Sequence, residues 1–370
     1  MAFNQRLRPQ NHYAPGGGNL SMNSRQLTLA AVKGEPHARV PVAQHNFPFC
    51  VRHCGVTMEQ FRRDPHVAAR VLADTADDFG YDCIIIDFDT CTLAEAMGST
   101  LVFPEHEPAR VSKFALARLE DGRGLGVPDP QRDGRLPLWL ETTRELRRLV
   151  GDEKAIMGRA DQGPFGLLFQ LRDSQKLMVD LVEADPQLLF DCLEICRQAG
   201  VRFAQAQLEA GADFTSIGDS AAGESLISPA MYARFAQPFQ KSYKEALGAG
   251  LISLHICGRT NNIIAGMVDT GFDILELDHA NDLERSLRLV NQRCSVWGNL
   301  DPSAVLAFGS KQTVLEASRK VLDTAIDLTW KFVLCPGCVA NANTPPKNIR
   351  AMTEAAARWG NYHRAPGRAN

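Results

Sequence analysis

The sequence predicts an α/β protein built as a single (β/α)₈ barrel of the TIM type. Short β-branched or apolar runs alternate with longer segments of helical period, which indicates βαβ units and a parallel sheet. Roughly seven or eight such units follow one another over residues 25–362, which favours a closed barrel over an open sheet. No Gly-x-Gly-x-x-Gly motif follows the first strand and no P-loop motif occurs, so a doubly wound nucleotide-binding sheet is disfavoured.

The elements of this barrel are predicted from the apolar pattern. The strands cover residues 39–42, 83–89, 155–161, 214–219, 251–257, 274–278, 295–300 and 332–335, with short excursions at 101–103 and 110–111. The helical segments cover residues 25–32, 68–79, 138–149, 174–210, 229–247, 261–270, 282–290, 311–325 and 346–359. Residues 1–24 are predicted to be a flexible leader, because Pro15 and three glycines begin no regular element, and residues 363–370 form a tail.

The composition excludes several classes of partner. The chain has 370 residues, is 45% hydrophobic and carries a net charge of -3, which gives no electrostatic case for nucleic acid or an anionic membrane. No apolar run is long enough to span a bilayer, and the polar N-terminal stretch lacks a signal-peptide core. The ten cysteines of such a long chain therefore predict a soluble cytoplasmic protein with reduced thiols, some of them available to a metal.

Polar side chains collect where the predicted strands end. Reactive groups in a (β/α)₈ barrel lie at the carboxyl ends of the strands, so these residues are expected to converge on one pocket. They are Asp87, Asp89, Asp161, Asp219, His255, Cys257, Asp278, Asn299, Asp301, Cys335 and Cys338.

The sharpest motif is His255-Ile-Cys257-Gly258. Residues two apart on a strand point to the same face, so the imidazole and the thiol are expected to project together. Cys338, in the run 335–338 after a later strand, supplies a third ligand. One His and two Cys match the three protein ligands of a catalytic zinc site, which keeps one position exchangeable. Cys338 is preferred to Cys335, because Cys335 lies within or just past its strand.

These cysteines also suit other interpretations. The 335–338 run also suits a redox pair or a structural knuckle, and a buried Cys is often a plain small hydrophobe. A structural four-cysteine site would need a second close pair, and neither Cys50 with Cys54 nor Cys192 with Cys196 fits well. The latter pair lies four residues apart on a predicted helix, where core packing explains it.

A set of motifs then resembles a known family. The runs are 254–258, 298–302, 336–338 and 344–349, preceded by 39–41, 94–98, 163–165, 211–213, 218–220 and 226–229, with Tyr232 and Pro238. In this order they are similar to the uroporphyrinogen decarboxylase superfamily, and more narrowly to its cobamide-dependent methyltransferase branch. The resemblance covers roughly residues 25–360 and implies a (β/α)₈ barrel.

The resemblance also implies a ligand set. The zinc site of the methyltransferase branch falls on His255, Cys257 and Cys338. Its fourth, acidic ligand would be Asp278, with Glu276 as the less favoured option. If the family ligand is glutamate, Asp278 is a departure from it, because the aspartate side chain is shorter.

The implied activity is methyl transfer between a corrinoid and a zinc-activated small substrate, either a thiol acceptor or an O- or N-methyl donor. The sequence does not choose the direction. No Asp-x-His-x-x-Gly signature of a corrinoid domain occurs, so the corrinoid is expected on a separate protein that docks over the barrel mouth. A homodimer is left open, because barrel faces can dimerise.

Three rival functions remain. A metal-free decarboxylase is disfavoured, because the region 51–55 offers only Arg52 where decarboxylases carry an arginine-rich segment. A folate-dependent corrinoid methyltransferase on the same fold would leave the Cys and His residues idle. A non-catalytic barrel with structural zinc would unfold when the metal is removed.

The remaining polar residues receive supporting roles. Asp161, Asp219 and Asn299 are candidate catalytic residues that orient the substrate or a zinc ligand. The candidate substrate-binding residues are Asp87, Asp89, Glu95, Arg259 and Asp301. Each has a plain alternative: Asp301 before a proline suits a helix cap, either Asp87 or Asp89 suits another, and Arg259 suits a surface cation.

Overall fold

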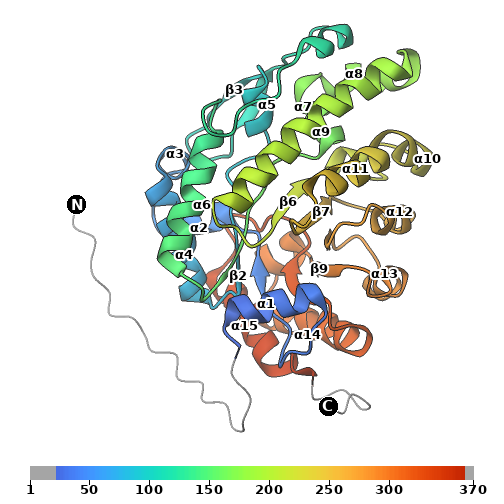
Figure 1. The fold of residues 1–370 in the computed structure, drawn as a ribbon. Helices are drawn as coiled ribbons and strands as arrows, with labels where there is room; N and C mark the ends of the chain where they lie inside the picture. Colours follow the sequence, from blue (N-terminus) through green and yellow to red (C-terminus); the bar gives the residue numbers. More distant parts are fainter. Residues whose placement is uncertain (1–21, 363–370) are drawn as a thin grey trace.

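The computed structural model describes residues 22–362, and over this range the chain forms the predicted barrel (Figure 1). Three strands pair in the order β1-β2-β5 and five in the order β10-β9-β8-β7-β6. Their bounds are β1 Ala43–Gln44, β2 Cys83–Ile85, β5 Ala155–Met157, β6 Thr215–Gly218, β7 Ile252–Ile256, β8 Ile274–Leu277, β9 Ser295–Leu300 and β10 Phe332–Pro336. Parallel bridges from Val42 to Leu334 and from Met157 to Phe214 join the two sheets at both edges, so the ring is closed.

Helices surround this ring of strands (Figure 1). The main outer helices are α4 Pro65–Phe79, α6 Leu136–Val150, α9 Pro186–Glu209, α11 Gln237–Leu247, α12 Ile264–Asp269, α13 Leu283–Val290, α14 Lys311–Leu328 and α15 Pro346–Trp359. Their apolar faces pack on the outer faces of the strands in one large buried cluster. The pattern of strand and helix therefore produces the layered shell that the sequence predicts.

Several short elements were not expected from the sequence. They are α2 Phe47–His53, α3 Met58–Arg63, α5 Thr92–Ala96, α7 Pro164–Leu171 and the short helical turns η1 Leu119–Gly124, η2 Ser220–Ala222 and η4 Pro302–Ala307. The predicted helix 229–247 is present but is divided into α10 Pro229–Met231, η3 Tyr232–Ala236 and α11. The two predicted excursions pair with each other as an antiparallel hairpin, β3 Thr100–Val102 with β4 Arg110–Lys113. Most of these pieces lie in the connections after strand ends, where barrels vary.

Several predicted elements have different bounds. The first strand is Ala43–Gln44 rather than 39–42, and β2 ends at Ile85 rather than at residue 89. The long helical region 174–210 is divided into α8 Ser174–Glu183 and α9, because Asp185 caps a new helix whose first residue is Pro186. Proline suits the first turn of a helix but disrupts an interior.

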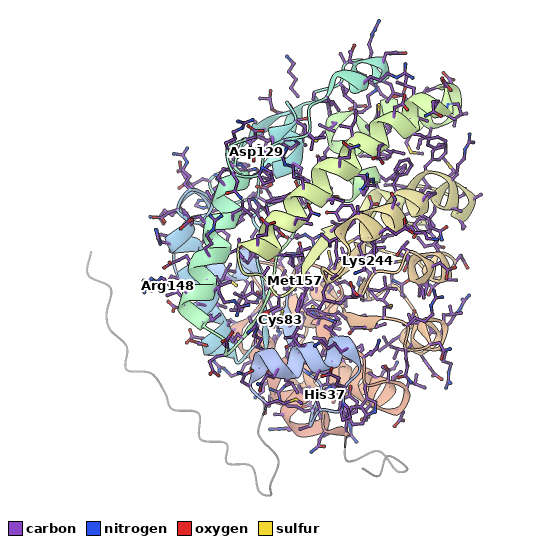
Figure 2. The ribbon with its side chains drawn as sticks, viewed as in Figure 1. His37, Cys83, Asp129, Arg148, Met157 and Lys244 are labelled. Atoms are coloured by element: carbon purple, nitrogen blue, oxygen red, sulfur yellow. The ribbon has the colours of Figure 1, made fainter. Side chains whose placement is uncertain are left out.

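The barrel lumen has an apolar floor. Every second residue of a strand points inward, and the first inward residues are apolar. They are Ala43, Cys83, Ile85, Ala155, Met157, Phe214, Ile274, Trp297, Val333 and Cys335. Cys83 and Met157 lie among the strands in Figure 2. This floor is a packed core, so any pocket must lie nearer the carboxyl ends of the strands.

Helix α1, Ser24–Lys33, closes the barrel at the amino ends of the strands. Its residues Ala31 and Val32 belong to the same apolar cluster as the floor. Asn23 and Gln26 form a capping box that begins the helix, and Arg25 pairs with Asp213, which precedes β6. Helix α1 begins at Ser24, the last residue of the predicted leader 1–24; residues 1–21 and the predicted tail 363–370 lie outside the described residues.

Within residues 22–362, no helix combines the length and the apolar character that a bilayer span requires.

Candidate metal centre

Strand β7 places two candidate ligands on the lumen side. His255 and Cys257 follow Ser253 at intervals of two residues, so they share the inward face, whereas Ile256 packs in the outer core. The His255 ring is 3% exposed, and its Nδ1 lies 3.2 Å from the carbonyl oxygen of Glu276. The carbonyl can only accept, so Nδ1 carries the proton and Nε2 keeps a lone pair. Nε2 is buried and has no hydrogen-bond partner.

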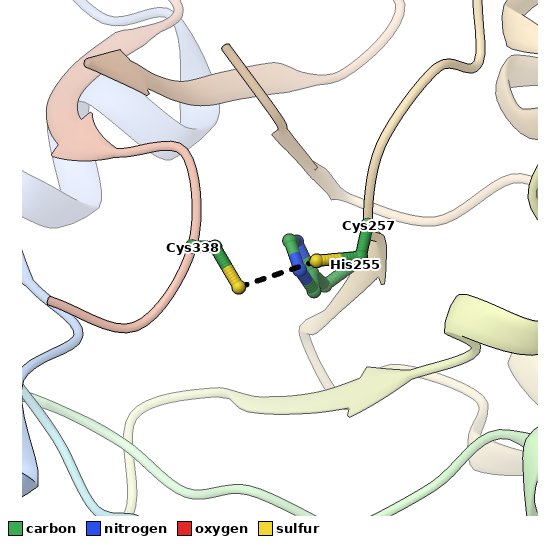
Figure 3. Close-up of side chains that lie close together, drawn as sticks. All are labelled: His255, Cys257 and Cys338. Atoms are coloured by element: carbon green, nitrogen blue, oxygen red, sulfur yellow. Dashed lines mark hydrogen bonds between the residues drawn. The ribbon is translucent and has the colours of Figure 1, made fainter. Parts of the chain in front are cut away.

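The third candidate ligand comes from the loop after β10. Pro336 ends the strand, and the Gly337 amide donates to the carbonyl of Leu300 at 2.7 Å. A Cβ atom at Gly337 would lie 2.5 Å from the backbone nitrogen of His279, so only glycine lets this loop lie against the end of β8. Cys338 Sγ then reaches within 3.2 Å of Cys257 Sγ (Figure 3).

These three side chains fit a metal ion. Their ligand atoms all lie within 4.8 Å of one another. Zinc binds sulfur and nitrogen at about 2.0–2.3 Å, which separates neighbouring ligand atoms by about 4 Å. The chemistry also matches, since the set holds two thiols and an imidazole whose Nε2 has no other partner. The structure thus brings together His255, Cys257 and Cys338, the set expected from the sequence.

The contact between the two thiols shifts their pKa values in opposite directions. The contact with Cys257, together with His255, holds the pKa of Cys338 well below its ordinary value. The same contact with Cys338, and burial, raise the pKa of Cys257. Cys338 is therefore the thiol that ionises first, as a metal ligand must.

Cys335 lies elsewhere. It belongs to the apolar floor and is 2% exposed. Burial raises its pKa well above the ordinary value, and it is a free cysteine, as is Cys338. The alternative of a redox pair in the run 335–338 therefore finds no geometric support.

Asp278 lies beside the cluster. Its Oδ2 is 3.7 Å from Cys257 Sγ, while Oδ1 accepts from the Ala280 amide and pairs with His279, both at 2.9 Å. Glu276, the other acidic option, accepts a 2.7 Å hydrogen bond from Ser253 at Oε1. A fourth ligand from either residue stays a prediction.

A polar layer surrounds the cluster one step above the floor. His45 Nε2 lies 2.6 Å from Asp87 Oδ2, and Arg159 Nε lies 3.4 Å from the same oxygen. Asp87 was predicted to face the pocket, but His45 and Arg159 were missed. Arg159 follows the inward residue Met157 by two positions, so strand alternation alone would have found it. His45 lies beyond the end of the first predicted strand.

Asp161 is a buried carboxyl group close enough to Asp87 and Asp89 to be affected by their charges. The residue is fully buried and has a positive φ of 63°. Its Oδ2 accepts from the Leu93 amide at 2.7 Å, whereas Oδ1 has no partner. Burial, followed by the charges of Asp89 and Asp87, raises the pKa of Asp161 to about 8.

Asp89 and Glu95 have a shared cationic partner. Arg135 donates to Asp89 Oδ2 at 2.7 Å and to Glu95 at 2.6 Å. The other Asp89 oxygen accepts from the Cys91 amide and the Thr92 hydroxyl at the start of α5. This favours the helix-cap alternative for Asp89, and the substrate-binding roles of both residues stay predictions.

The carboxylate of Asp219 is engaged by residues of the helices around the barrel. Its carboxylate accepts from the Gly166 amide in the first turn of α7 at 2.6 Å and from Gln240 at 2.8 Å. Burial raises its pKa to about 6. Both carboxylate oxygens therefore already accept hydrogen bonds from residues outside the ring of strands. The catalytic role of Asp219 stays a prediction.

The other predicted residues lie at the mouth of the barrel. Asn299 donates to the carbonyl of Asn281 at 3.1 Å, and Asp301 caps η4 through the amides of Ser303 and Ala304. Both residues line a cavity of about 540 Å³ beside α13 and α14. Arg259 is exposed, which agrees with its alternative interpretation as a surface cation.

Fold and site together define a class of protein: a (β/α)₈ barrel with a His-x-Cys and distant Cys cluster at the carboxyl ends of its strands. The sequence profile described as uroporphyrinogen decarboxylase (URO-D) matches residues 23–359. The chain therefore belongs to the uroporphyrinogen decarboxylase family.

Several relatives are methyltransferases. The chain is 26% identical to the methylcobamide:CoM methyltransferase MtaA of Methanosarcina barkeri, over 88% of this chain and 95% of that one. It is 31% identical to the methylcobamide:CoM methyltransferase MtbA of Methanosarcina acetivorans, over 79% and 86%. A solved methyltransferase from Methanosarcina mazei superposes with a TM-score of 0.84 at 26% identity, covering 91% and 98%.

Proposed function

We propose that this protein transfers a methyl group from a methylated corrinoid to a small thiol that is activated by zinc at His255, Cys257 and Cys338. The observation that carries the proposal is the convergence of these three ligand atoms, with a free His255 Nε2, in the barrel lumen. The relatives named methylcobamide:CoM methyltransferases support the corrinoid and favour a thiol as the acceptor.

A zinc ion bound here would keep a substrate thiol ionised at neutral pH, where the free group, with a pKa of ~8.5, is mostly protonated. The chain prepares this site in three ways. The Glu276 carbonyl orients the imidazole of His255, the Gly337 turn delivers Cys338, and the buried lumen lowers the local polarity around the sulfur atoms.

The corrinoid is proposed to arrive on a separate protein. Large apolar side chains are exposed in connections that follow the carboxyl ends of the strands, where that protein would dock. They are Val102, Phe103, Leu226 and Phe308, of which Phe308 is 84% exposed. We propose them as contact residues for the corrinoid protein.

The first experiment measures zinc content and methyl transfer together. Reduced, purified protein is incubated with methylcobalamin and a small thiol, and the thioether product is quantified by mass spectrometry. Cys338→Ser should lose most of its zinc and about a hundredfold or more of the transfer rate. Cys335→Ala is the matched control, because Cys335 lies in the floor, and it should keep both.

Three outcomes would contradict the proposal. Unchanged transfer by the Cys338→Ser variant would remove zinc from the reaction. Decarboxylation of uroporphyrinogen by metal-free protein, or transfer from methyltetrahydrofolate in place of methylcobalamin, would favour one of the rival functions.

A further inference from the structure

Helix α8 carries apolar side chains on two opposite faces. Leu177 and Leu181 are buried and lie four residues apart, on the side that packs against α7 and α9. On the opposite side, Val179 is 52% exposed and Val182 is 79% exposed. The outer face of a helix that covers a barrel is normally polar, so this pair of valines marks a candidate contact surface.

Charged side chains flank the two valines. Lys176 precedes Val179 by three positions and Glu183 follows it by four, so these side chains share one face of the helix. Lys176 and Glu183 are exposed, and neither forms an ion pair within residues 22–362. Together with Val179 and Val182 they form what we call the α8 stripe. The helix lies at the rim of the molecule (Figure 1), so a second protein can reach this stripe.

The α8 stripe is complementary to itself when its direction is reversed. A twofold axis beside Val179 relates two antiparallel copies of the helix, and residues at equal distances before and after the axis then lie opposite each other. Lys176 of each copy therefore lies opposite Glu183 of the other copy, with the valines between the two charge pairs. A parallel arrangement would place like charges opposite each other, so the stripe favours the antiparallel one.

From this complementarity we propose that the outer face of α8 is a contact between two copies of this chain, made by antiparallel α8 helices. Two Lys176–Glu183 ion pairs set the register, and the valines between them lose their contact with water. The occupant is a second copy, because each end of the stripe finds its opposite charge on the same stripe of another molecule. The inference is independent of the metal site and of methyl transfer.

The contact is small, so the dimer should be weak. Helix α8 has 10 residues, and a helix of that length extends only about 15 Å. One helix pair of this size falls among the smallest specific interfaces, and we expect a dissociation constant on the order of 10–100 µM. The chain should therefore be monomeric when dilute and dimeric at high concentration.

Sedimentation velocity of the full chain over a range of about 1–300 µM measures this equilibrium. Wild-type protein should pass from monomer to dimer within the range. Val182→Asp should raise the dissociation constant about tenfold or more, because it places an unpaired carboxylate in the contact. Lys347→Glu is the control for a reversed charge, since Lys347 is exposed on α15, far from α8 in Figure 1, and it should dimerise as wild type does.

Charge reversal tests the antiparallel register directly. Lys176→Glu alone, or Glu183→Lys alone, places like charges opposite each other at both ends of the contact, and each should weaken the dimer about tenfold. The two substitutions combined restore opposite charges in reversed order and should recover the wild-type dissociation constant within about threefold. All of these side chains are exposed, so the variants should keep the wild-type thermal transition.

Three results would overturn the inference. Wild-type protein that stays monomeric at every concentration would exclude the contact between copies, and a partner of different sequence would become the candidate for the α8 face. A dimer that Val182→Asp and both single reversals leave intact would lie on another surface. A combined reversal that stays as weak as the single reversals would contradict the antiparallel pairing of Lys176 with Glu183.

Discussion

At the scale of single residues, several of the described buried polar atoms that lack a hydrogen-bond partner lie near the carboxyl ends of the barrel strands. Four of these atoms are His255 Nε2, Asp87 Oδ1, Arg159 Nε and Asp161 Oδ1. All four residues lie on or just beyond the carboxyl ends of strands, above the apolar floor. Leaving such an atom unsatisfied costs about 1–3 kcal/mol, so a cluster of them is expected where a ligand or metal completes the contacts.

Asp161 leads to a prediction on pH dependence. Its pKa is raised to about 8 in the folded protein by burial and then by Asp89, whereas an unfolded aspartate titrates near 3.9. Between these values the folded state holds the extra proton, so the free energy of unfolding falls as pH rises, by up to about 1.4 kcal/mol per pH unit. Asp161→Asn removes this proton linkage and tolerates the positive φ.

The expected result is that Asp161→Asn gains stability relative to wild type between pH 5 and pH 8, by a few kcal/mol. Urea unfolding at the two pH values measures the change. Asp185→Asn alters an exposed carboxylate that caps α9 and should show no such trend. An equal difference between Asp161→Asn and wild type at both pH values would show that Asp161 does not hold a proton in the folded state.

At the scale of elements, the metal cluster depends on how one loop packs on another strand. The loop after β10 reaches β7 only because Gly337 approaches the backbone of His279 after β8. Gly337→Ala should push this loop outward and separate Cys338 from His255 and Cys257. We expect the zinc dissociation constant to rise about tenfold or more, as for other residues that orient metal ligands.

Competition with a chromogenic chelator measures this affinity. Gly126→Ala is the matched control, because a Cβ atom there meets nothing within 4 Å, and it should leave zinc affinity unchanged. Wild-type affinity in Gly337→Ala would mean that the loop can relax without moving the sulfur of Cys338.

The bounds of the strands and helices also show which elements the local sequence pattern was sufficient to predict. The strands β6, β7, β8 and β9 lie within one or two residues of their predicted bounds, because long apolar runs report strand alternation directly. The short helices α2, α3, α5 and α7 were missed, since few residues define their period and tertiary contacts stabilise them. Pro186 divides the region 174–210, a boundary that its turn chemistry could have predicted.

At the scale of the whole molecule, the fold is held by two apolar clusters rather than by the metal. The outer cluster joins helices to strands, and the floor joins the strands to α1. The three candidate ligands contribute only β7 and the loop after β10 to the ring. Zinc is therefore expected to be dispensable for folding, in contrast to the structural-zinc alternative.

Chelation should leave the far-ultraviolet circular dichroism spectrum and the cooperative thermal transition intact. The transition temperature should fall by only a few degrees, because zinc at a hundred times its dissociation constant contributes about 2.7 kcal/mol. Adding zinc back should restore both stability and transfer. Loss of the cooperative transition on chelation would contradict this account and favour a structural metal.

The sequence by itself determined the order of the barrel strands and of the main helices, and it singled out His255, Cys257 and Cys338 as candidate ligands, because alternation along a strand and position at its end are local properties. Only the tertiary structure decided the partners across the barrel. Asp219 turned toward α7, and Arg159 met Asp87 and Ser216 on other strands. Such pairings depend on ring closure, which brings together segments that no periodicity in a single stretch of sequence relates.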